Sequence, residues 1–247
     1  MEIKGKTAII TGATGELGGA IVVMLAKSGV QCICIYNKNS KQAKELGAVL
    51  NRLKTKNLFI QTDLTTQKNI EKVFAEIEKF TTPQILINTA AVFDKKPIAE
   101  LTFDYIRHTL DVNFTVSMIM TQKFVALVHR KIKSRAKPLA KIINITDIVA
   151  QNPPAGFSIY SASKSALIAA TKSLAKELAP DFTVNAVSPG IINFQKGTSA
   201  KLKKRILSHI PAGRTGSPDE IAAAVKFLIE NDYLTGQIIN VDGGKTI

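Results

Sequence analysis

Short apolar, β-branched runs alternate with longer helical stretches along the chain, and this alternation constrains the fold more than any other feature. The predicted strands span 7–11, 31–36, 57–61, 84–88, 141–146, 183–187 and 237–241. The predicted helices span 17–27, 41–54, 68–80, 160–178 and 218–230, and a longer helical stretch over 103–135 is expected to break once near 108–111. Near-continuous apolar strands between such helices predict an α/β fold with a parallel sheet covered on both faces. Right-handed crossovers make it a doubly wound sheet of about seven strands flanked by helices.

The 247 residues contain no Pro/Gly/Ser-rich linker, no composition break and no internal repeat, which predicts a single domain over 1–247. Hydrophobic residues make up 45% and charged residues 21%, as in ordinary globular proteins. No apolar run approaches the roughly 18 residues of a membrane helix, and the first residues lack the apolar core of a signal peptide. These observations exclude disordered, disulfide-stapled and membrane proteins, and they predict a cytoplasmic protein without a membrane partner.

Cysteine and histidine are few in this chain. Cys32 and Cys34 lie two residues apart in a predicted strand, so they share one face and are poorly placed to bridge each other. The histidines, His108, His129 and His209, are scattered and form no metal-ligand cluster. We expect two small buried cysteines in a reducing compartment and no metal site.

The chain is strongly basic, with 33 Lys and Arg residues against 19 Asp and Glu residues and a formal charge of +14. Such a surface attracts anions, including phosphate-bearing cofactors and acidic proteins. Two basic stretches stand out, which are Arg130, Lys131, Lys133, Arg135 and Lys137, and then Lys201, Lys203, Lys204 and Arg205. Neither is interleaved with aromatic residues, so we expect solvated faces and no nucleic-acid binding. The first stretch could dock an acidic carrier protein.

The first predicted strand runs directly into a glycine-rich segment, Thr11-Gly-Ala-Thr-Gly-Glu-Leu-Gly18, and a predicted helix follows. Glycines here let the chain turn sharply, let the backbone approach a pyrophosphate, and let the helix pack close to the sheet. The helix start offers free N–H groups and a positive dipole end to phosphate. A tight turn without a ligand is the alternative, but the position after the first strand favours a dinucleotide site. Its predicted contacts are Gly12, Thr14, Gly15, Glu16, Leu17 and Gly18.

The end of the second predicted strand indicates which dinucleotide binds. An acidic side chain there would hold the ribose hydroxyls of NAD. This strand instead ends at Tyr36, Asn37 and Lys38. Because Asn37 and Lys38 can bind a 2′-phosphate that a carboxylate would repel, we expect NADPH as the cofactor.

Tyr160 and Lys164 open a predicted helix four residues apart, which places both side chains on one face. A phenol ordinarily has a pKa near 10, and a nearby ammonium group lowers it toward neutrality. The pair follows the fifth predicted strand, at the edge of the sheet where ligands bind in doubly wound folds. Tyr160 and Lys164 are therefore candidate acid–base residues.

Taken in order, these motifs resemble the short-chain dehydrogenase/reductase family, a group of compact, single-domain Rossmann-type enzymes, over essentially the whole chain. The residues that carry the resemblance are 11–18, Asp63, 88–91, Asn113, Tyr160, Lys164, 189–190 and 241–244. The resemblance implies an NADP(H)-dependent oxidoreductase. In this family the helices around 112–128 and after Tyr160 build a homotetramer, so the same assembly is expected.

The resemblance also implies a role for each matched position. Tyr160 gives a proton to the atom opposite the one that receives hydride. Lys164 binds the nicotinamide ribose and lowers the pKa of the tyrosine, and Asn113 holds a water of the proton relay. The remaining contacts are Asp63 and Leu64 at the adenine, Asn88 and Ala90 along the ribose, and Pro189, Gly190 and Ile192 beside the nicotinamide.

The sequence departs from the family pattern at three positions. Asp147 stands where the family has its catalytic serine, and an ionised carboxylate cannot donate a hydrogen bond to a ketone. An aspartate here, with Phe93 as an aromatic that stacks on the substrate, resembles the pteridine reductase branch. Glu16 instead stands where that branch has arginine. The alternative for Asp147 is an incidental polar residue in a degraded site.

Three functions remain open at this point. The first is NADPH-dependent reduction of a C=N or C=O bond in a pterin-like substrate, with Phe93, Asp147 and Tyr160 at the substrate. The second is a 3-oxoacyl-(acyl-carrier-protein) reductase of fatty acid synthesis, whose substrate arrives on a carrier protein. The third is a non-catalytic NADP-binding paralogue, which the retention of Asn113, Tyr160 and Lys164 disfavours. In each case the polar segment 193–214 is the predicted substrate lid.

Overall fold

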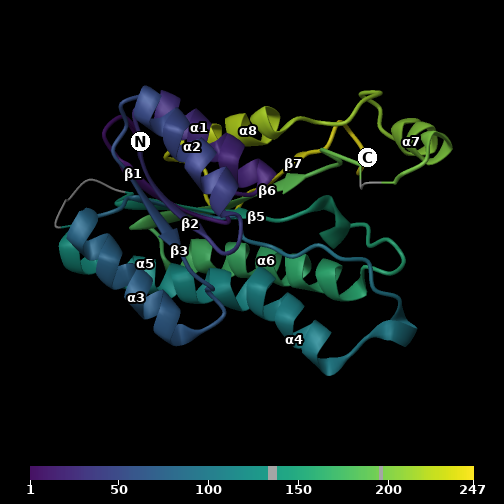
Figure 1. Cartoon of the computed structure of the whole chain (residues 1–247), viewed down its shortest axis with the longest axis horizontal. Helices are drawn as coiled ribbons and strands as arrows, with labels where there is room; N and C mark the ends of the chain where they lie inside the picture. The colour runs from purple at the N-terminus through teal and green to yellow at the C-terminus, as the bar shows by residue number, and fades with distance from the viewer. Residues whose placement is uncertain (133–137, 195–196) are drawn as a thin grey trace.

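A computed structural model describes residues 1–132, 138–194 and 197–247. Its strands form a seven-stranded parallel sheet in the order β3-β2-β1-β4-β5-β6-β7. Helices cover both faces of this sheet (Figure 1). The predicted doubly wound α/β fold is confirmed.

The strands are close to their predicted positions. They are β1 (Thr7–Thr11), β2 (Gln31–Tyr36), β3 (Asn57–Gln61), β4 (Ile85–Asn88), β5 (Ala140–Ile145), β6 (Phe182–Pro189) and β7 (Ile238–Val241). The α-helices are α1 (Glu16–Lys27), α2 (Ser40–Arg52), α3 (Gln67–Phe80), α4 (Phe103–Leu110), α5 (Val116–Lys131), α6 (Ser158–Glu177), α7 (Ala200–Leu207) and α8 (Pro218–Glu230). Within the described ranges, none of these helices has the length and apolar character needed to cross a membrane.

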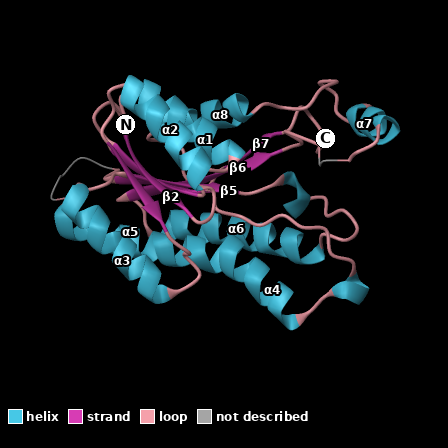
Figure 2. Ribbon diagram, viewed as in Figure 1, coloured by secondary structure: helices cyan, strands magenta, loops and turns pink. Residues whose placement is uncertain are grey.

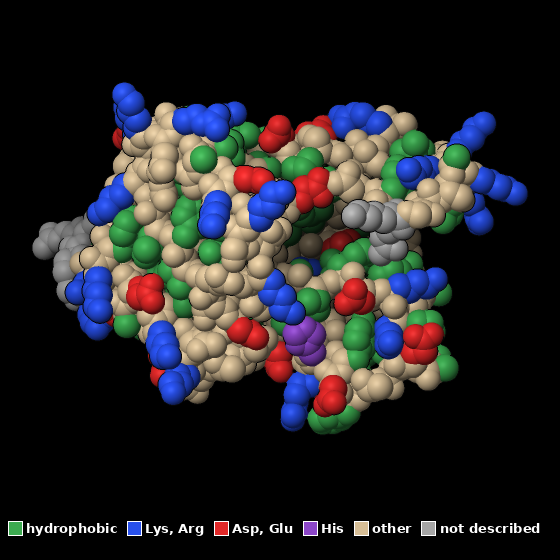
Figure 3. All heavy atoms as spheres, in the orientation of Figure 1, with side chains coloured by type: hydrophobic (Ala, Val, Ile, Leu, Met, Phe, Trp, Pro, Cys, Tyr) green, Lys and Arg blue, Asp and Glu red, His purple; other side chains and the backbone are tan. Residues whose placement is uncertain are grey.

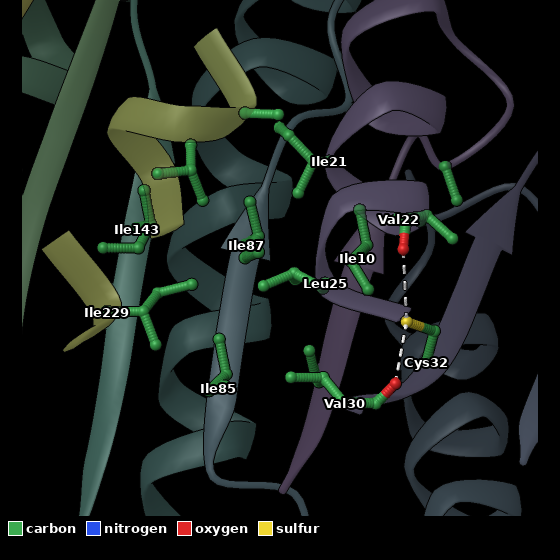
Figure 4. Packing of buried hydrophobic residues seen from close by; sticks show 14 of the residues in the cluster. Ile10, Ile21, Val22, Leu25, Val30, Cys32, Ile85, Ile87, Ile143 and Ile229 are labelled. Carbon is green, nitrogen blue, oxygen red and sulfur yellow. Dashed lines mark hydrogen bonds between the residues drawn. The ribbon is translucent and has the colours of Figure 1, made fainter. Parts of the chain in front are cut away.

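Alternate residues of each strand face two separate hydrophobic layers, as the period of two along a strand requires. Helices α1, α2 and α8 lie on one face of the sheet, and α3, α5 and α6 lie on the other (Figure 2). In the first layer, Leu25 of α1 lies beside Ile10 of β1, and Ile229 of α8 lies beside Ile143 of β5 (Figure 4). The second layer includes Ile9 of β1 and Phe124 of α5.

Both cysteines belong to the first layer and are free and buried. The Cys32 thiol lies within hydrogen-bond distance of the carbonyl oxygens of Val22 and Val30, at 3.8 and 3.7 Å (Figure 4). Burial raises the pKa of Cys32 to about 12. The prediction that Cys32 and Cys34 share one buried face is confirmed, and both thiols are placed as core residues.

The strand order reverses beside β1, which pairs with β2 on one side and with β4 on the other. The connections after β1 and β4 therefore leave toward opposite faces of the sheet. This topology opens a crevice at the carboxyl ends of the strands, where ligands bind in folds of this kind.

The helical stretch after β4 differs from its prediction. No break occurs near 108–111, because a π-helical segment, Asp111–Thr115, joins α4 directly to α5. A π turn keeps the backbone hydrogen-bonded while it shifts the register of the side chains, and such turns are frequent at functional sites. Helix α5 ends at Lys131, and Lys133, Arg135 and Lys137 of the first basic stretch lie outside the described residues.

The predicted lid over 193–214 contains a helix, α7, which the lack of apolar periodicity did not indicate. Its sequence, AKLKKRIL, consists of good helix formers, and Ser199 caps it by accepting a hydrogen bond from the Leu202 N–H. None of its side chains is buried, so it forms without a core-facing stripe. Residues 195–196 of the predicted lid lie outside the described ranges.

Candidate active site

The predicted phosphate-binding loop lies between β1 and α1. Gly12 has a φ of +63°, and a Cβ on Gly18 would lie 2.3 Å from the carbonyl oxygen of Gly12. Neither position accepts a larger side chain without a backbone shift. Gly15, at the start of α1, offers no capping side chain, so the first N–H groups of the helix remain available to an anion.

A cleft of about 560 Å³ opens over this loop, and its size suits a nucleotide-sized ligand. Figure 3 shows the surface hollowed between the two helical layers. The predicted cofactor contacts that line the cleft are Gly12, Thr14, Gly15, Glu16, Leu17, Gly18, Tyr36, Asn37, Lys38, Asp63, Leu64 and Ala90. The structure therefore brings together the residues predicted for the phosphate and adenosine parts of the cofactor.

The end of the cleft where the adenosine is predicted, called the adenosine end below, is rich in charge. The Thr65 N–H and hydroxyl donate to Asp63 Oδ1 at 2.9 and 2.8 Å. These hydrogen bonds, together with the positive charges of His108 and Lys38, hold the pKa of Asp63 below its ordinary value. His108 lines the cleft and was not predicted as a site residue. The sequence spacing could have indicated His108 as a site residue. His108, Val112 and Val116 follow each other at intervals of four residues, and all three line the cleft.

Glu16 stands where a carboxylate would face the cofactor phosphates. The Asn193 side-chain amide donates a hydrogen bond to the Glu16 carboxylate. This contact links the phosphate-binding loop to the start of the predicted lid. The hydrogen bond also gives the carboxylate a partner, which lowers the free-energy cost of holding a negative charge beside a phosphate site.

The predicted acid–base residues meet at the carboxyl edge of β5. Tyr160 and Lys164 of α6 are buried. The Tyr160 hydroxyl donates to Asp147 Oδ2 at 2.8 Å, and Lys164 Nζ donates to the Ile145 carbonyl oxygen at 2.9 Å. Asp147 Oδ1 accepts from the Val149 N–H at 2.9 Å, which fixes the carboxyl group. The structure brings Tyr160, Lys164 and Asp147 together.

Burial and mutual charge set the pKa values of this group. Burial and the neighbouring Asp147 raise the pKa of Tyr160 well above its ordinary value. Burial lowers the pKa of Lys164 to about 8, and Asp147 acts in the opposite direction. Burial raises the pKa of Asp147 against the hydrogen bonds that it accepts. The predicted lowering of the Tyr160 pKa by Lys164 is not found, because a carboxyl group and not the ammonium is the hydrogen-bond partner of the phenol.

Asn113 lies fully buried in the π-helical segment. Its Oδ1 accepts from the Val92 N–H at 2.8 Å, and its Nδ2 donates to the Val92 carbonyl oxygen at 3.1 Å and to Ser163 Oγ at 3.0 Å. These bonds hold the segment after β4 against α6. Ser163 was not predicted, and the water-holding role of Asn113 stays a prediction.

Asn88 does not reach the cleft with its side chain. Its Nδ2 donates to Asn144 Oδ1 at 2.9 Å, inside the sheet layer, and Asn144 Nδ2 donates to Thr171 Oγ1 at 2.9 Å. The Asn88 Oδ1 atom has no hydrogen-bond partner among the described residues. This buried polar chain turns Asn88 inward, whereas Ala90, two residues later, lines the cleft.

An aromatic group stands next to Tyr160. Phe93 lies edge-on to the Tyr160 ring, with centroids 4.7 Å apart, and stacks on Phe157 with centroids 5.0 Å apart. Phe93 remains 46% exposed, so part of its ring is open to a ligand. Phe157, which directly precedes α6, was not predicted.

The carboxyl end of β6 carries Pro189, followed by Gly190 and Ile192. These residues are not among those that line the cleft. The Gly190 N–H donates to the Val241 carbonyl oxygen at 2.9 Å, and a Cβ on Gly190 would lie 2.6 Å from the Cα of Asp242. Ile192 packs against the hydrophobic layer of α1 and α8. The two chain segments after β6 and β7 are therefore in close contact at the carboxyl edge of the sheet, where the nicotinamide is predicted.

One segment joins the two parts of the site. The N–H groups of Thr89 and Ala90 donate to Thr11 Oγ1 at 3.0 and 3.2 Å, which fixes the segment after β4 to the end of β1. Residues 89–92 line the cleft, and Phe93 contacts Tyr160. Tyr160 does not itself line the cleft and lies beyond this segment, in contact with Phe93.

Sequence and structure comparisons agree with this geometry. Residues 12–246 match the family described as enoyl-(acyl carrier protein) reductase. The chain is 35% identical to the 3-oxoacyl-(acyl-carrier-protein) reductase of Aquifex aeolicus, over 99% of each chain. A blue fluorescent protein from a metagenomic library, solved in complex with NADPH, superposes over the whole of both chains with a TM-score of 0.89 and 28% identity. A short-chain dehydrogenase/reductase of Serratia marcescens also superposes over both whole chains, with a TM-score of 0.89 and 26% identity.

The fold and these relatives define an oxidoreductase built on a Rossmann-like sheet. Within that class, the chain belongs to the short-chain dehydrogenase/reductase family.

Proposed function

We propose that this chain is an NADPH-dependent reductase that transfers hydride to a C=O or C=N bond, with Tyr160 as the proton donor. The observation that carries this proposal is the hydrogen bond from the Tyr160 hydroxyl to Asp147 Oδ2 at 2.8 Å, beside the buried Lys164. NADPH supplies the hydride when it is bound. Tyr160 supplies the proton, and Lys164 holds the nicotinamide ribose and stabilises negative charge that develops on the phenol.

The charges around Tyr160 favour reduction over alcohol oxidation. Reduction begins from a protonated phenol, and Asp147 keeps Tyr160 protonated because it raises the pKa of that residue. Oxidation would begin from a phenolate beside a carboxylate, and two buried negative groups in contact repel each other strongly.

The same proposal assigns the cofactor contacts. The phosphate-binding loop fits a pyrophosphate, because a Cβ on Gly12 would fill the cradle and lie 2.9 Å from the Cα of Ala90. Lys38 and Asn37 bind the 2′-phosphate, which selects NADPH over NADH. The further contacts are Asp63 and Leu64 at the adenine, Ala90 along the ribose, and Pro189, Gly190 and Ile192 beside the nicotinamide.

Two substrate classes fit this proposal. Asp147 and Phe93 favour a planar, pterin-like ring, because a carboxyl group can bind ring N–H donors and an exposed aromatic face can stack on the ring. The 35% identity to a 3-oxoacyl-(acyl-carrier-protein) reductase favours a 3-oxoacyl thioester on a carrier protein. We slightly prefer the pterin-like ring, because Asp147 replaces the serine of the family pattern directly beside the proposed proton donor, Tyr160.

A substrate panel tests the proposal. The purified chain is supplied with NADPH or NADH and with a dihydropterin, a 3-oxoacyl thioester and a simple ketone, and cofactor oxidation is followed by absorbance. We expect oxidation of NADPH with at least one of the first two substrates, and faster turnover with NADPH than with NADH. Tight NADPH binding without turnover of any of these substrates would contradict the proposal.

The remaining expectations concern the whole chain. We propose a single domain over 1–247 with 193–214 as its lid, a homotetramer in solution, and a cytoplasmic location. The Glu16–Asn193 contact supports the lid, because it joins the segment to the phosphate-binding loop. Gel filtration with light scattering tests the assembly.

A further inference from the structure

Two connections of the chain lie side by side, the one after β4 and the one that leads into α6 (Figure 1). The Lys96 N–H donates to the Gly156 carbonyl oxygen at 2.7 Å. Gly156 has a φ of +85°, and a Cβ there would lie 3.0 Å from the Cε of Lys95. Phe93 stacks on Phe157, with ring centroids 5.0 Å apart and ring planes inclined by 15°. The two connections are therefore joined by a backbone hydrogen bond, by close packing and by an aromatic pair.

The backbone on both sides of Phe93 is held independently of this aromatic pair. Val92, directly before it, exchanges two hydrogen bonds with the Asn113 side chain, at 2.8 and 3.1 Å. Lys96, three residues after it, is held by the hydrogen bond just described. The Phe93 side chain is 46% exposed, and one of its ring contacts is the stack on Phe157. Loss of the Phe157 ring would therefore free the orientation of Phe93 without releasing its backbone.

Phe157 occupies the position directly before α6, where a polar side chain usually caps a helix. Ser, Thr, Asp and Asn are preferred there because they accept a hydrogen bond from a free N–H group of the first turn. Thr66 caps α3 in this way, and Ser217 caps α8. The side chain of Phe157 makes no capping hydrogen bond. Its ring therefore gives the start of α6 no hydrogen bond, and its aromatic contact is with Phe93.

We propose that Phe157 is a positioning residue, which makes the site specific for a flat, ring-shaped substrate by holding Phe93 as a stacking surface beside Tyr160. The inference rests on the proposed function, because the substrate is the one that Tyr160 protonates. Phe157 covers one face of the Phe93 ring, so a substrate ring stacks on the other face. The ring centroids of Phe93 and Tyr160 are 4.7 Å apart, so the stacked ring is held next to the proposed proton donor. A flexible acyl chain has no aromatic face and gains little from this surface.

Steady-state reduction of a dihydropterin and of a 3-oxoacyl thioester, with NADPH as the reductant, tests the inference. Phe157→Leu keeps an apolar side chain, Phe157→Asn places a preferred capping residue before α6, and Phe157→Tyr keeps the aromatic ring. Phe227→Leu is the matched control, because Phe227 is a 52% exposed phenylalanine of α8, on the other face of the sheet. Thermal unfolding and the Kd for NADPH show that each variant is folded and keeps its cofactor site.

We expect Phe157→Leu and Phe157→Asn to raise the KM for the dihydropterin about fivefold, the size of one aromatic stacking contact. Their kcat for this substrate changes little, because the lost contact binds the substrate and does not take part in the proton transfer. The KM for the thioester and the Kd for NADPH also change little. Phe157→Tyr and Phe227→Leu keep the wild-type KM for the dihydropterin.

An unchanged KM for the dihydropterin in both Phe157→Leu and Phe157→Asn would overturn the inference and leave the proposed function intact. An equal rise in the KM for the thioester, or a Phe157→Tyr protein that behaves like Phe157→Leu, would also overturn it, since either result indicates a purely structural ring. A wild-type chain that reduces the thioester and not the dihydropterin would do the same. If the wild-type chain reduces none of the tested substrates, the proposed function itself fails.

Discussion

The two ends of the candidate site, the cleft and the group around Tyr160, are built in different ways. The adenosine end is open, and it consists of glycine backbone, a helix start and exposed side chains such as Lys38. The Tyr160 end of the site lies outside the cleft lining and consists of buried polar side chains, Tyr160, Lys164 and Asn113, each of which already has a hydrogen-bond partner in the protein. The proposed function assigns the binding of charge to the first end and proton transfer to the second.

This difference explains how each end responds to substitution. At the adenosine end, each contact is a separate interaction of modest size, because water competes with it. At the Tyr160 end, a single replacement leaves buried partners unsatisfied and alters several pKa values together. We therefore expect large effects on turnover at one end and smaller effects on affinity at the other.

Tyr160→Phe gives the largest expected effect. It removes the proton donor but keeps the ring that packs on Phe93, so kcat falls about 10³-fold while the Kd for NADPH changes little. The measurement is steady-state NADPH oxidation with binding followed by fluorescence. Tyr233→Phe, at a 99% exposed tyrosine, is the control and keeps full activity. A Tyr160→Phe protein that keeps a tenth of the wild-type kcat would break the contrast between the two ends.

Gly18→Ala tests the backbone side of the comparison. The added Cβ would lie 2.3 Å from the carbonyl oxygen of Gly12, so the phosphate-binding loop must shift. We expect the Kd for NADPH to rise about 30-fold, the loss of roughly 2 kcal/mol of phosphate contacts. Gly47→Ala on α2, where a Cβ would meet Phe59 at an ordinary 3.6 Å, is the control and binds normally. Calorimetric binding at matched folded fractions measures both, and unchanged affinity in Gly18→Ala would refute a phosphate role for the loop.

Lys38→Gln sharpens the comparison at the open end. Loss of one charge beside the adenosine should weaken NADPH binding about tenfold and leave NADH binding unchanged. Lys44→Gln, at an exposed position on α2, is the matched control for lost charge. Parallel titrations with the two dinucleotides measure the ratio, and an equal loss for NADH would show that Lys38 does not select the 2′-phosphate.

Asp147→Asn keeps the proton donor, so its expected effect is on the pH dependence of turnover. Asp147 raises the pKa of both Tyr160 and Lys164, so its neutral replacement lowers both. Because burial sets the pKa of Lys164 to about 8, the alkaline limb of kcat/KM is expected near pH 8 in the wild type.

In Asp147→Asn this limb should move about one unit toward lower pH. Glu45→Gln, an exposed acid on α2, is the control and keeps the wild-type profile. A limb that stays in place, or that moves to higher pH, contradicts the assigned effect of Asp147 on the pKa of Lys164.

The sequence predicts those features that depend on neighbouring residues. The glycine loop, the strands, and the spacing of Tyr160 and Lys164 are local, so pattern and position suffice to place them. The end of β2 likewise indicated Lys38 as a residue of the cleft.

Features that depend on packing between distant segments are not predicted. The inward turn of Asn88 depends on Asn144, 56 residues away. The π-helical segment changes the register of the side chains along the helix, and no apolar periodicity in the sequence indicates this change. Helix α7 depends on helix-forming residues and the Ser199 cap, without the fully buried stripe that usually indicates a helix.

A crystal structure of the complex with NADPH tests the central claim most directly, because one ligand must then span both ends of the site. The account predicts the 2′-phosphate at Lys38 and the nicotinamide ring beside Tyr160, with the phenol hydroxyl directed at the substrate position and Lys164 on the ribose. A Tyr160 hydroxyl that points away from the nicotinamide, or a nicotinamide position filled by Phe93, would contradict it.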